Sequence, residues 1–230
     1  MREIVLDTET TGFEPEQGDR IVEIGAVELY NHVPTGKVYH QYINPERSMP
    51  QEAFEVHGLG DDFLRDKPVF AKIVDDFLAF IGTDAKLVIH NATFDVKFLN
   101  AELKWANRPL LPKDCAIDTL MIARKKFPGS PASLDALCRR FGIDNSSRTL
   151  HGALLDSEIL ADVYLELIGG KQPDLVLAPV SAGRSNSGTD EEWRPARRPV
   201  PLASRITDEE KAAHAAFVEK LGEKALWSRG

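Results

Sequence analysis

Short apolar runs separated by turn residues occupy the first fifth of the chain. The three runs are "EIVLDTET" (3–10), "RIVEIGAVEL" (20–29) and "KVYHQYINP" (37–45). Runs of this length, rich in β-branched and aromatic residues and bounded by turns, are typical of strands. The sequence therefore predicts that the chain begins with a three-stranded meander.

The apolar spacing changes to a helical period after about residue 68. A continuous apolar run, "AKLVIHN" (85–91), interrupts it and predicts a buried parallel strand. The next helix has Asn91 or Thr93 as its predicted N-cap. The predicted helices cover 68–82, 91–106, 118–127, 133–143 and 153–170. Strands followed by alternating helices and strands indicate one α/β layered domain over residues 1–170.

The composition changes again after Gly170. Residues 171–206 are dense in Pro, Ser, Gly and Arg without a sustained period, which predicts a flexible linker. Residues 207–230 return to helical spacing, with Thr207 and Glu210 in the positions of a capping box. The apolar residues predicted to share one face of this helix are Ala213, Phe217, Leu221 and Ala225.

The composition limits the class of protein. The 230 residues are 43% hydrophobic and 28% charged, which allows a packed core. Cys115 and Cys138 form neither a disulfide framework nor a zinc spacing, so we expect a reducing cytoplasm. The N-terminal residues lack the apolar length expected of a signal peptide, and no window approaches the ~20 apolar residues of a membrane helix. A net charge of −8 argues by itself against nucleic-acid binding.

Two carboxylates, Asp7 and Glu9, lie at the end of the first predicted strand. Residues i and i+2 of a strand point to the same side, so the two charges repel each other unless a cation lies between them. Carboxylate oxygens are hard donors that suit Mg²⁺ or Mn²⁺ better than zinc. The alternatives are that one of the two points to solvent, or that both cap a turn.

Two later segments strengthen the case for a metal site. "HNATFDVKFL" places Asp95 at the start of a helix directly after a buried strand, where α/β folds bind ligands. "HGALLDSEIL" places Asp156 early in the last helix, five residues after His151. Each acid could instead be a first-turn residue favoured by the helix dipole, and His151 a surface or capping histidine. Together the five residues predict one acidic centre.

The segments "VLDTETTGF", "HNATFD" and "HGALLD" resemble the three exonuclease motifs of the DnaQ-like (DEDDh) 3′→5′ exonucleases, over about residues 3–170. This resemblance implies an RNase H-like fold: a five-stranded mixed sheet, its first three strands antiparallel, with helices on both faces. It also implies hydrolysis with two divalent cations, Mg²⁺ or Mn²⁺. Asp7 would bridge the ions, Glu9 and Asp156 would complete one site, and Asp95 would hold the second ion. His151 would accept a proton from the attacking water.

The segment "EAFEVHGL" resembles the part of the family that contacts the terminal nucleotide. The resemblance implies that Glu52 and His57 bind that nucleotide, and that Val56, Thr8 and Thr10 pack on its base or sugar. The alternative for His57 is a turn residue before a glycine.

The net charge is a poor guide to nucleic-acid binding where bound metals neutralise the local acids, and the basic residues also cluster. They either meet phosphates or form a solvated helix face, and they are Arg124, Lys125, Lys126, Arg139, Arg140 and Arg148. We expect an acidic protein to bind DNA weakly alone and to depend on a partner that delivers the strand end.

The tail resembles that of the proofreading subunits of bacterial replicative DNA polymerases. Gln172, Leu175 and Leu177 have the spacing of a peptide that binds the sliding clamp. The terminal segment resembles the one that binds the polymerase alpha subunit, with Phe217, Leu221 and Trp227 as anchors. A small theta-like subunit is a further candidate partner. The alternatives are a chance motif in a linker and a terminal helix that packs on its own domain.

The leading hypothesis is a proofreading exonuclease that removes mismatched 3′-terminal nucleotides of DNA. The alternative within the same fold is a free-standing exonuclease that trims RNA or oligonucleotides. A third hypothesis, from a different class, is an inactive binding or scaffold module, against which the five filled catalytic positions argue.

Overall fold

The computed structural model describes residues 1–148, 150–170 and 206–221, and the chain divides into two units, Met1–Leu177 and Ala178–Gly230. No helix among the described residues is long and apolar enough to cross a membrane.

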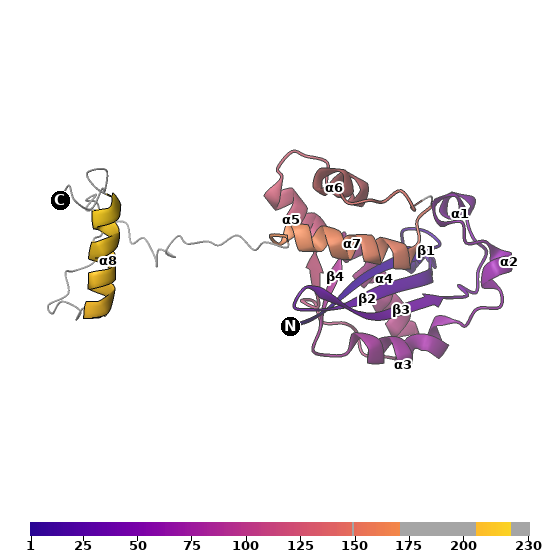
Figure 1. Ribbon diagram of the computed structural model, residues 1–230. Coiled ribbons are helices and arrows are strands. Elements are labelled where there is room, and N and C mark those ends of the chain that lie inside the picture. The colour runs from indigo at the N-terminus through magenta and orange to yellow at the C-terminus, as the bar shows by residue number, and fades with distance from the viewer. Residues whose placement is uncertain (149, 171–205, 222–230) are drawn as a thin grey trace, which may run out of the picture. The chain divides into compact units, whose positions relative to one another are not determined.

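The first unit is built on a five-stranded mixed sheet in the order β3-β2-β1-β4-β5 (Figure 1). β1 pairs antiparallel with β2, and β2 with β3, whereas β4 runs parallel to both β1 and β5. The meander and the mixed sheet expected from the sequence are therefore confirmed. The strands are β1 (Arg2–Thr10), β2 (Ile21–Tyr30), β3 (Val33–Tyr42), β4 (Lys86–Ile89) and β5 (Ala116–Asp118).

Five of the helices in this unit match the predicted ones. They are α3 (Phe70–Ile81), α4 (Ala92–Trp105), α5 (Thr119–Lys126), α6 (Leu134–Phe141) and α7 (Ala153–Leu167). Asn91 is the N-cap of α4, with a φ of +69°, but its side chain makes no capping hydrogen bond. Thr93 lies inside the helix, so that alternative for the N-cap is wrong.

Three short elements were not predicted from the apolar pattern. They are α1 (Gln51–His57), α2 (Asp61–Leu64) and β5. α1 buries only its last residue, so it has no apolar period to detect, and β5 has three half-buried residues.

The two faces of the sheet carry separate cores, which follow from the alternation of side chains along β1. Ile4 and Leu6 point to the face covered by α3 and α4. Val5 points to the opposite face, where it packs with residues of α5, α6 and α7. In Figure 1, α7 runs along one face of the sheet and α3 lies on the other. Asp7 and Glu9 continue the series of Val5 and therefore belong to the α7 face.

The beginning of α7 lies directly on the backbone of β2. A Cβ atom at Gly25 would be 2.1 Å from the backbone nitrogen of Leu154, so only glycine fits there. Ser157 Oγ donates to the Gly25 carbonyl at 2.9 Å, and the Ala153 amide donates to Glu23 Oε2 at 3.2 Å. These contacts fix the first turns of α7 against the centre of the sheet.

The second unit contains α8 (Asp208–Leu221). The Glu210 amide donates to Thr207 Oγ1 at 3.2 Å and the Thr207 amide donates to Glu210 Oε2 at 2.8 Å, which confirms the predicted capping box. No residue of α8 is buried, and the side chains of Phe217 and Leu221 are exposed.

Replacing Gly25 with alanine is expected to lower the free energy of unfolding by about 3 kcal/mol, because the added methyl group clashes with the backbone of α7. Thermal unfolding followed by circular dichroism measures this loss. Gly36→Ala in β3 is the control, since a Cβ there meets open space and only its φ of +84° is unfavourable, at about 1 kcal/mol. Equal losses in the two variants would contradict the close approach of α7 to β2.

Candidate active site

Four carboxylates converge where β1 ends. Asp7 and Glu9 lie on β1, Asp156 lies in the first turn of α7, and Asp95 lies in the first turn of α4, which follows β4. Because β4 is parallel to β1, the start of α4 comes to the same edge of the sheet as the end of β1. The site thus takes acids from helices on both faces of the sheet.

His151 completes this cluster, which we call the acidic centre. One ligand atom each of Glu9, His151 and Asp156 lies within 4.8 Å of the other two. Asp7 interacts electrostatically with the other three acids. The structure therefore brings together the five residues that the sequence predicted. Their roles in binding metal and in catalysis remain predictions.

Burial and mutual repulsion make three of these carboxylic acids weak. Burial raises the pKa of Asp7 well above its ordinary value, and the negative charges of the other three acids raise it further. Burial and the charge of Asp156 raise the pKa of Glu9 to about 8. Burial raises the pKa of Asp95 to about 7, although a hydrogen bond from Thr8 lowers it. Asp7, Glu9 and Asp95 therefore lie where additional positive charge would be favourable.

Asp156 differs from the other three acids. Burial alone would raise its pKa, but hydrogen bonds from His151 and Arg148 outweigh burial and hold the pKa below its ordinary value. The Arg148 guanidinium donates to both oxygens of Asp156, at 2.5 and 2.7 Å. Asp156 is thus the acid that stays ionised most readily in the metal-free protein.

The donor set fits hard divalent cations. The ligand atoms are carboxylate oxygens and one imidazole nitrogen, a set that Mg²⁺ and Mn²⁺ accept. A divalent cation would also supply the positive charge that these buried acids lack.

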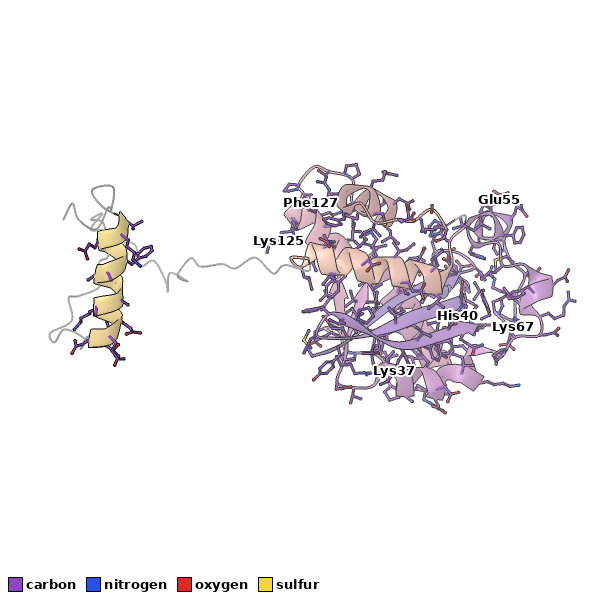
Figure 2. All side chains as sticks on the ribbon, viewed as in Figure 1. Lys37, His40, Glu55, Lys67, Lys125 and Phe127 are labelled. Carbon is purple, nitrogen blue, oxygen red and sulfur yellow. The ribbon has the colours of Figure 1, made fainter. Side chains whose placement is uncertain are left out.

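Neighbouring residues hold the ligands in place. Thr8 Oγ1 donates to Asp95 Oδ1 at 2.7 Å, so the Thr8 hydroxyl is engaged with the acid rather than free for substrate. Glu23 anchors the start of α7 and also accepts from His40 Nε2 at 2.6 Å. His40 lies on β3 and is labelled in Figure 2.

The predicted substrate residues line one cavity of about 590 Å³ beside the acidic centre. We call it the nucleotide pocket. The predicted residues in its wall are Thr8, Glu9, Thr10, Glu52, Val56 and His57. Burial lowers the pKa of His57, which favours the neutral ring at pH 7. His57 is the buried last residue of α1, directly before Gly58, and its Nδ1 accepts from the Leu59 amide at 3.0 Å, so the structure is compatible with both readings of this residue.

Two aromatic rings at this pocket were not predicted to line it. Phe13 is 82% exposed and lies edge to face against Phe94, with ring centroids 6.4 Å apart. Phe94 lines the pocket and also packs on buried Phe98. Nothing in the sequence distinguishes Phe13 from an ordinary loop residue, since its exposure depends on the fold.

A second cavity, of about 450 Å³, lies on the other side of the acidic centre. Asp7, His151 and Asp156 line it together with His90 and Arg148. Glu9 faces the nucleotide pocket, whereas Asp7 faces this second cavity.

Asp118 also supports the site and was missed at the sequence level. Its carboxylate accepts from the amides of Leu120 and Asn91, at 2.9 and 3.2 Å, and so links the start of α5 to the start of α4. From the sequence alone, Asp118 looks like an ordinary N-cap residue.

The wall formed by α1 is tied to the loop that carries His151. The backbone amide of His151 donates to the Val56 carbonyl at 3.1 Å. A Cβ atom at Gly58 would be 2.8 Å from the side chain of Leu150, so the two segments are in close contact.

The basic residues do not form one group. Arg124, Lys125 and Lys126 are exposed on the last turn of α5, and Lys125 is labelled in Figure 2. Arg139 and Arg140 are exposed in the last turn of α6. Arg148 is different, because its side chain is 9% exposed and lies in the acidic centre.

The predicted binding residues of the tail are only partly described. Phe217 and Leu221 are exposed on α8. Gln172, Leu175, Leu177, Ala225 and Trp227 lie outside the described residues.

Comparison with known proteins shows relatives over nearly the whole chain. The exonuclease family model, RNase_T, matches residues 4–164. A protein named DNA polymerase III subunit epsilon from Rickettsia felis is 51% identical over 224 residues, covering 96% of this chain and 97% of the relative. The protein of the same name from Escherichia coli K12 is 47% identical over 238 residues, covering 98% and 97%.

Solved structures show the same fold. Exonuclease X in complex with 5′ overhanging duplex DNA has a TM-score of 0.56 at 26% identity, covering 72% of this chain and 90% of that one. The nuclease domain of 3′hExo, a DEDDh family member bound to rAMP, has a TM-score of 0.63 at 21% identity, covering 73% and 91%. At that identity the second likeness concerns the fold alone.

Mn²⁺ affinity is expected to rise with pH between 6 and 8. The raised pKa values of Asp95 and Glu9 mean that these acids hold protons in the metal-free protein below about pH 7 and 8 respectively. A cation needs the ionised oxygens, so binding releases protons, and each proton released gives about a tenfold gain in affinity per pH unit. Titration calorimetry at pH 6, 7 and 8 measures the dependence.

Glu9→Gln is expected to flatten this pH dependence above pH 7, because it removes the acid with the pKa of about 8. Glu158→Gln, on an exposed position of α7, is the matched control and is expected to leave it unchanged. An affinity for Mn²⁺ that is independent of pH in the unmodified protein would contradict the prediction.

Proposed function

The chain belongs to the exonuclease family whose model matches residues 4–164, and we propose that it is the proofreading subunit that removes mismatched 3′-terminal nucleotides of DNA for a replicative polymerase. Relatives about 50% identical over nearly their full length are named DNA polymerase III subunit epsilon. The chain is therefore a 3′→5′ exonuclease of such a polymerase complex.

One observation supports this function more than any other. Asp7, Glu9, Asp95 and Asp156 meet at one edge of the sheet beside His151, next to a pocket of about 590 Å³. A phosphodiester is anionic and repels hydroxide, so its hydrolysis needs positive charge at this position. The family depends on divalent metal, and we propose two ions, Mg²⁺ or Mn²⁺, which when bound would supply an activated water and stabilise the leaving oxygen.

The four carboxylates would bind different ions. In our proposal Asp7 contributes to both sites, because it interacts electrostatically with Asp95 of α4 and with Asp156 of α7. Glu9 and Asp156 complete one site, and Asp95, oriented by Thr8, contributes to the other.

We propose that His151 acts as the general base. Its side chain is 49% exposed at the edge of the acidic centre, where water reaches it. Its Nδ1 lies 3.3 Å from Asp156 Oδ2, and this carboxylate would stabilise the imidazolium that forms when the ring accepts a proton.

The nucleotide pocket would hold the terminal nucleotide. We propose that Glu52 and His57 bind its sugar and 3′ end, and that Val56 and Thr10 pack on the base or sugar. Thr10 Oγ1 donates to the Gly12 carbonyl at 2.6 Å and so shapes the loop that carries Phe13. Selectivity for mismatches would then arise because a wrongly paired terminus separates more easily from the template.

In this proposal the tail binds the partner proteins. The epsilon relatives align with 96% of the chain, which includes most of the residues after 170. We propose that residues 207–230 bind the polymerase alpha subunit, since α8 buries none of its residues on its own. Gln172, Leu175 and Leu177 would bind the sliding clamp, and a theta-like subunit is a further partner. The cytoplasmic location expected from the sequence stays a prediction.

A second function remains within the same fold. The 3′hExo structure with rAMP belongs to a protein of similar fold that binds a ribonucleotide. Trimming of RNA or oligonucleotides is therefore the alternative function. The rates at which this chain hydrolyses DNA and RNA strands of the same sequence distinguish the two functions.

His151→Ala is expected to reduce the hydrolysis of a nucleoside 5′-phosphate ester with Mn²⁺ by about 10²- to 10⁴-fold, the usual effect of removing a general base. Its Mn²⁺ affinity is expected to persist, because the carboxylates remain. Asp7→Ala is expected to lose both activity and metal affinity. His214→Ala on α8 is the control for removing a histidine. If the unmodified protein turns over the ester no faster than Asp7→Ala does, only the scaffold hypothesis is left. If His151→Ala loses Mn²⁺ binding, His151 is a metal ligand and not the general base.

Removing residues 172–230 is expected to leave ester hydrolysis intact and to abolish association with a polymerase, because the acidic centre lies wholly within residues 1–170. Co-purification with the polymerase subunit alpha measures the association. Retained binding by the shortened chain would refute the role of the tail.

A further inference from the structure

Arg148 places a cation inside the acidic centre. Its guanidinium donates to both oxygens of Asp156, at 2.5 and 2.7 Å, and through Nη1 to Asp135 Oδ1 at 2.9 Å. Its side chain is only 9% exposed. Asp7 and Glu9 also interact with its charge. Arg148 thus meets the same acids that would hold a metal ion.

The same side chain also engages the proposed base. Arg148 Nη2 lies 2.7 Å from His151 Nδ1 and 3.3 Å from His151 Nε2. A guanidinium has only N–H donors and no acceptor, so the ring nitrogen that it bonds must accept the hydrogen bond. In this arrangement the lone pair of His151 is engaged and cannot accept a proton from water.

One guanidinium therefore holds both the Asp156 carboxylate and the His151 ring in a resting arrangement. A carboxylate with a bidentate arginine has its best acceptor positions filled, which leaves less of Asp156 for another cation. Without this arginine, however, Asp156 would be a buried charge among like charges, which is strongly unfavourable.

We propose that Arg148 is a positioning residue that occupies the place of a divalent cation at Asp156 and keeps the acidic centre assembled until metal is bound. Loading of the site requires the guanidinium to release at least one oxygen of Asp156 together with Nδ1 of His151. Asp135, on α6, then retains the guanidinium beside the site. This inference rests on the proposed role of Asp156 as a metal ligand.

The geometry of arginine is essential to this role. The planar fork contacts two oxygens and a ring nitrogen at once, whereas the ammonium group of lysine acts as a point charge. Asp135 is suited to receive the released guanidinium because its side chain is 45% exposed and is already oriented by Asn145 Nδ2, which donates at 2.9 Å.

Mn²⁺ binding to the full chain without DNA tests the proposal. Titration calorimetry compares the unmodified protein with Arg148→Gln, Arg148→Lys and the control Arg139→Gln, which removes an exposed charge from α6. Thermal unfolding of the metal-free and Mn²⁺-loaded forms is a second readout. Asp156→Asn shows whether the measured binding involves Asp156.

Arg148→Gln is expected to bind Mn²⁺ about tenfold more tightly, because the positive charge that competes for the oxygens of Asp156 is removed. Its metal-free form is expected to unfold about 5 °C or more below the unmodified protein, and Mn²⁺ is expected to restore most of the difference. Arg148→Lys is expected to lie between the two, and this variant decides the question if Arg148→Gln fails to fold. Arg139→Gln is expected to match the unmodified protein in both readouts.

The possible outcomes distinguish a failure of the role of Arg148 from a failure of the proposed metal site. Equal or weaker Mn²⁺ binding in Arg148→Gln, with binding lost in Asp156→Asn, would overturn the role of Arg148 alone, because a purely structural arginine would weaken metal binding when removed. Unchanged Mn²⁺ binding in Asp156→Asn would instead overturn the proposed metal assignment.

Discussion

The repulsion among four carboxylates at the end of β1 is the constraint on which the rest of the site depends. Burial and proximity raise the pKa values of Asp7, Glu9 and Asp95, so the cluster is unfavourable unless positive charge is present. Such an arrangement contributes nothing to folding by itself. Its presence in a core position is understandable when the protein uses the same charges to hold cations against an anionic substrate.

The fold compensates by fixing each acid independently. The contact of α7 with Gly25, reinforced by Ser157 and Glu23, fixes the height of Asp156 above the sheet. Thr8 orients Asp95 from the neighbouring position on the same strand that carries Asp7. Because these contacts come from buried strands and helices rather than from loops, the ligands keep their places in spite of the repulsion.

Much of this site could be predicted from the sequence, for identifiable reasons. The spacing of Asp7 and Glu9 within an apolar strand, and the placement of Asp95 and Asp156 at helix starts, follow from local periodicity. The position of Arg148 does not, because a basic residue in a loop usually lies on the surface and its burial depends on α6 and α7 together. α1 was not predicted because its residues face a cavity and solvent instead of the core. The exposure of Phe13 likewise depends on the surrounding fold.

The hydrogen bond from the His151 amide to the Val56 carbonyl has a mechanical consequence. Val56 belongs to the helix that forms one wall of the nucleotide pocket, and His151 belongs to the loop before α7. This hydrogen bond joins the two segments, so in our proposal a nucleotide seated against α1 would also steady the imidazole. Recognition of the strand end would in this way be coupled to the position of the base.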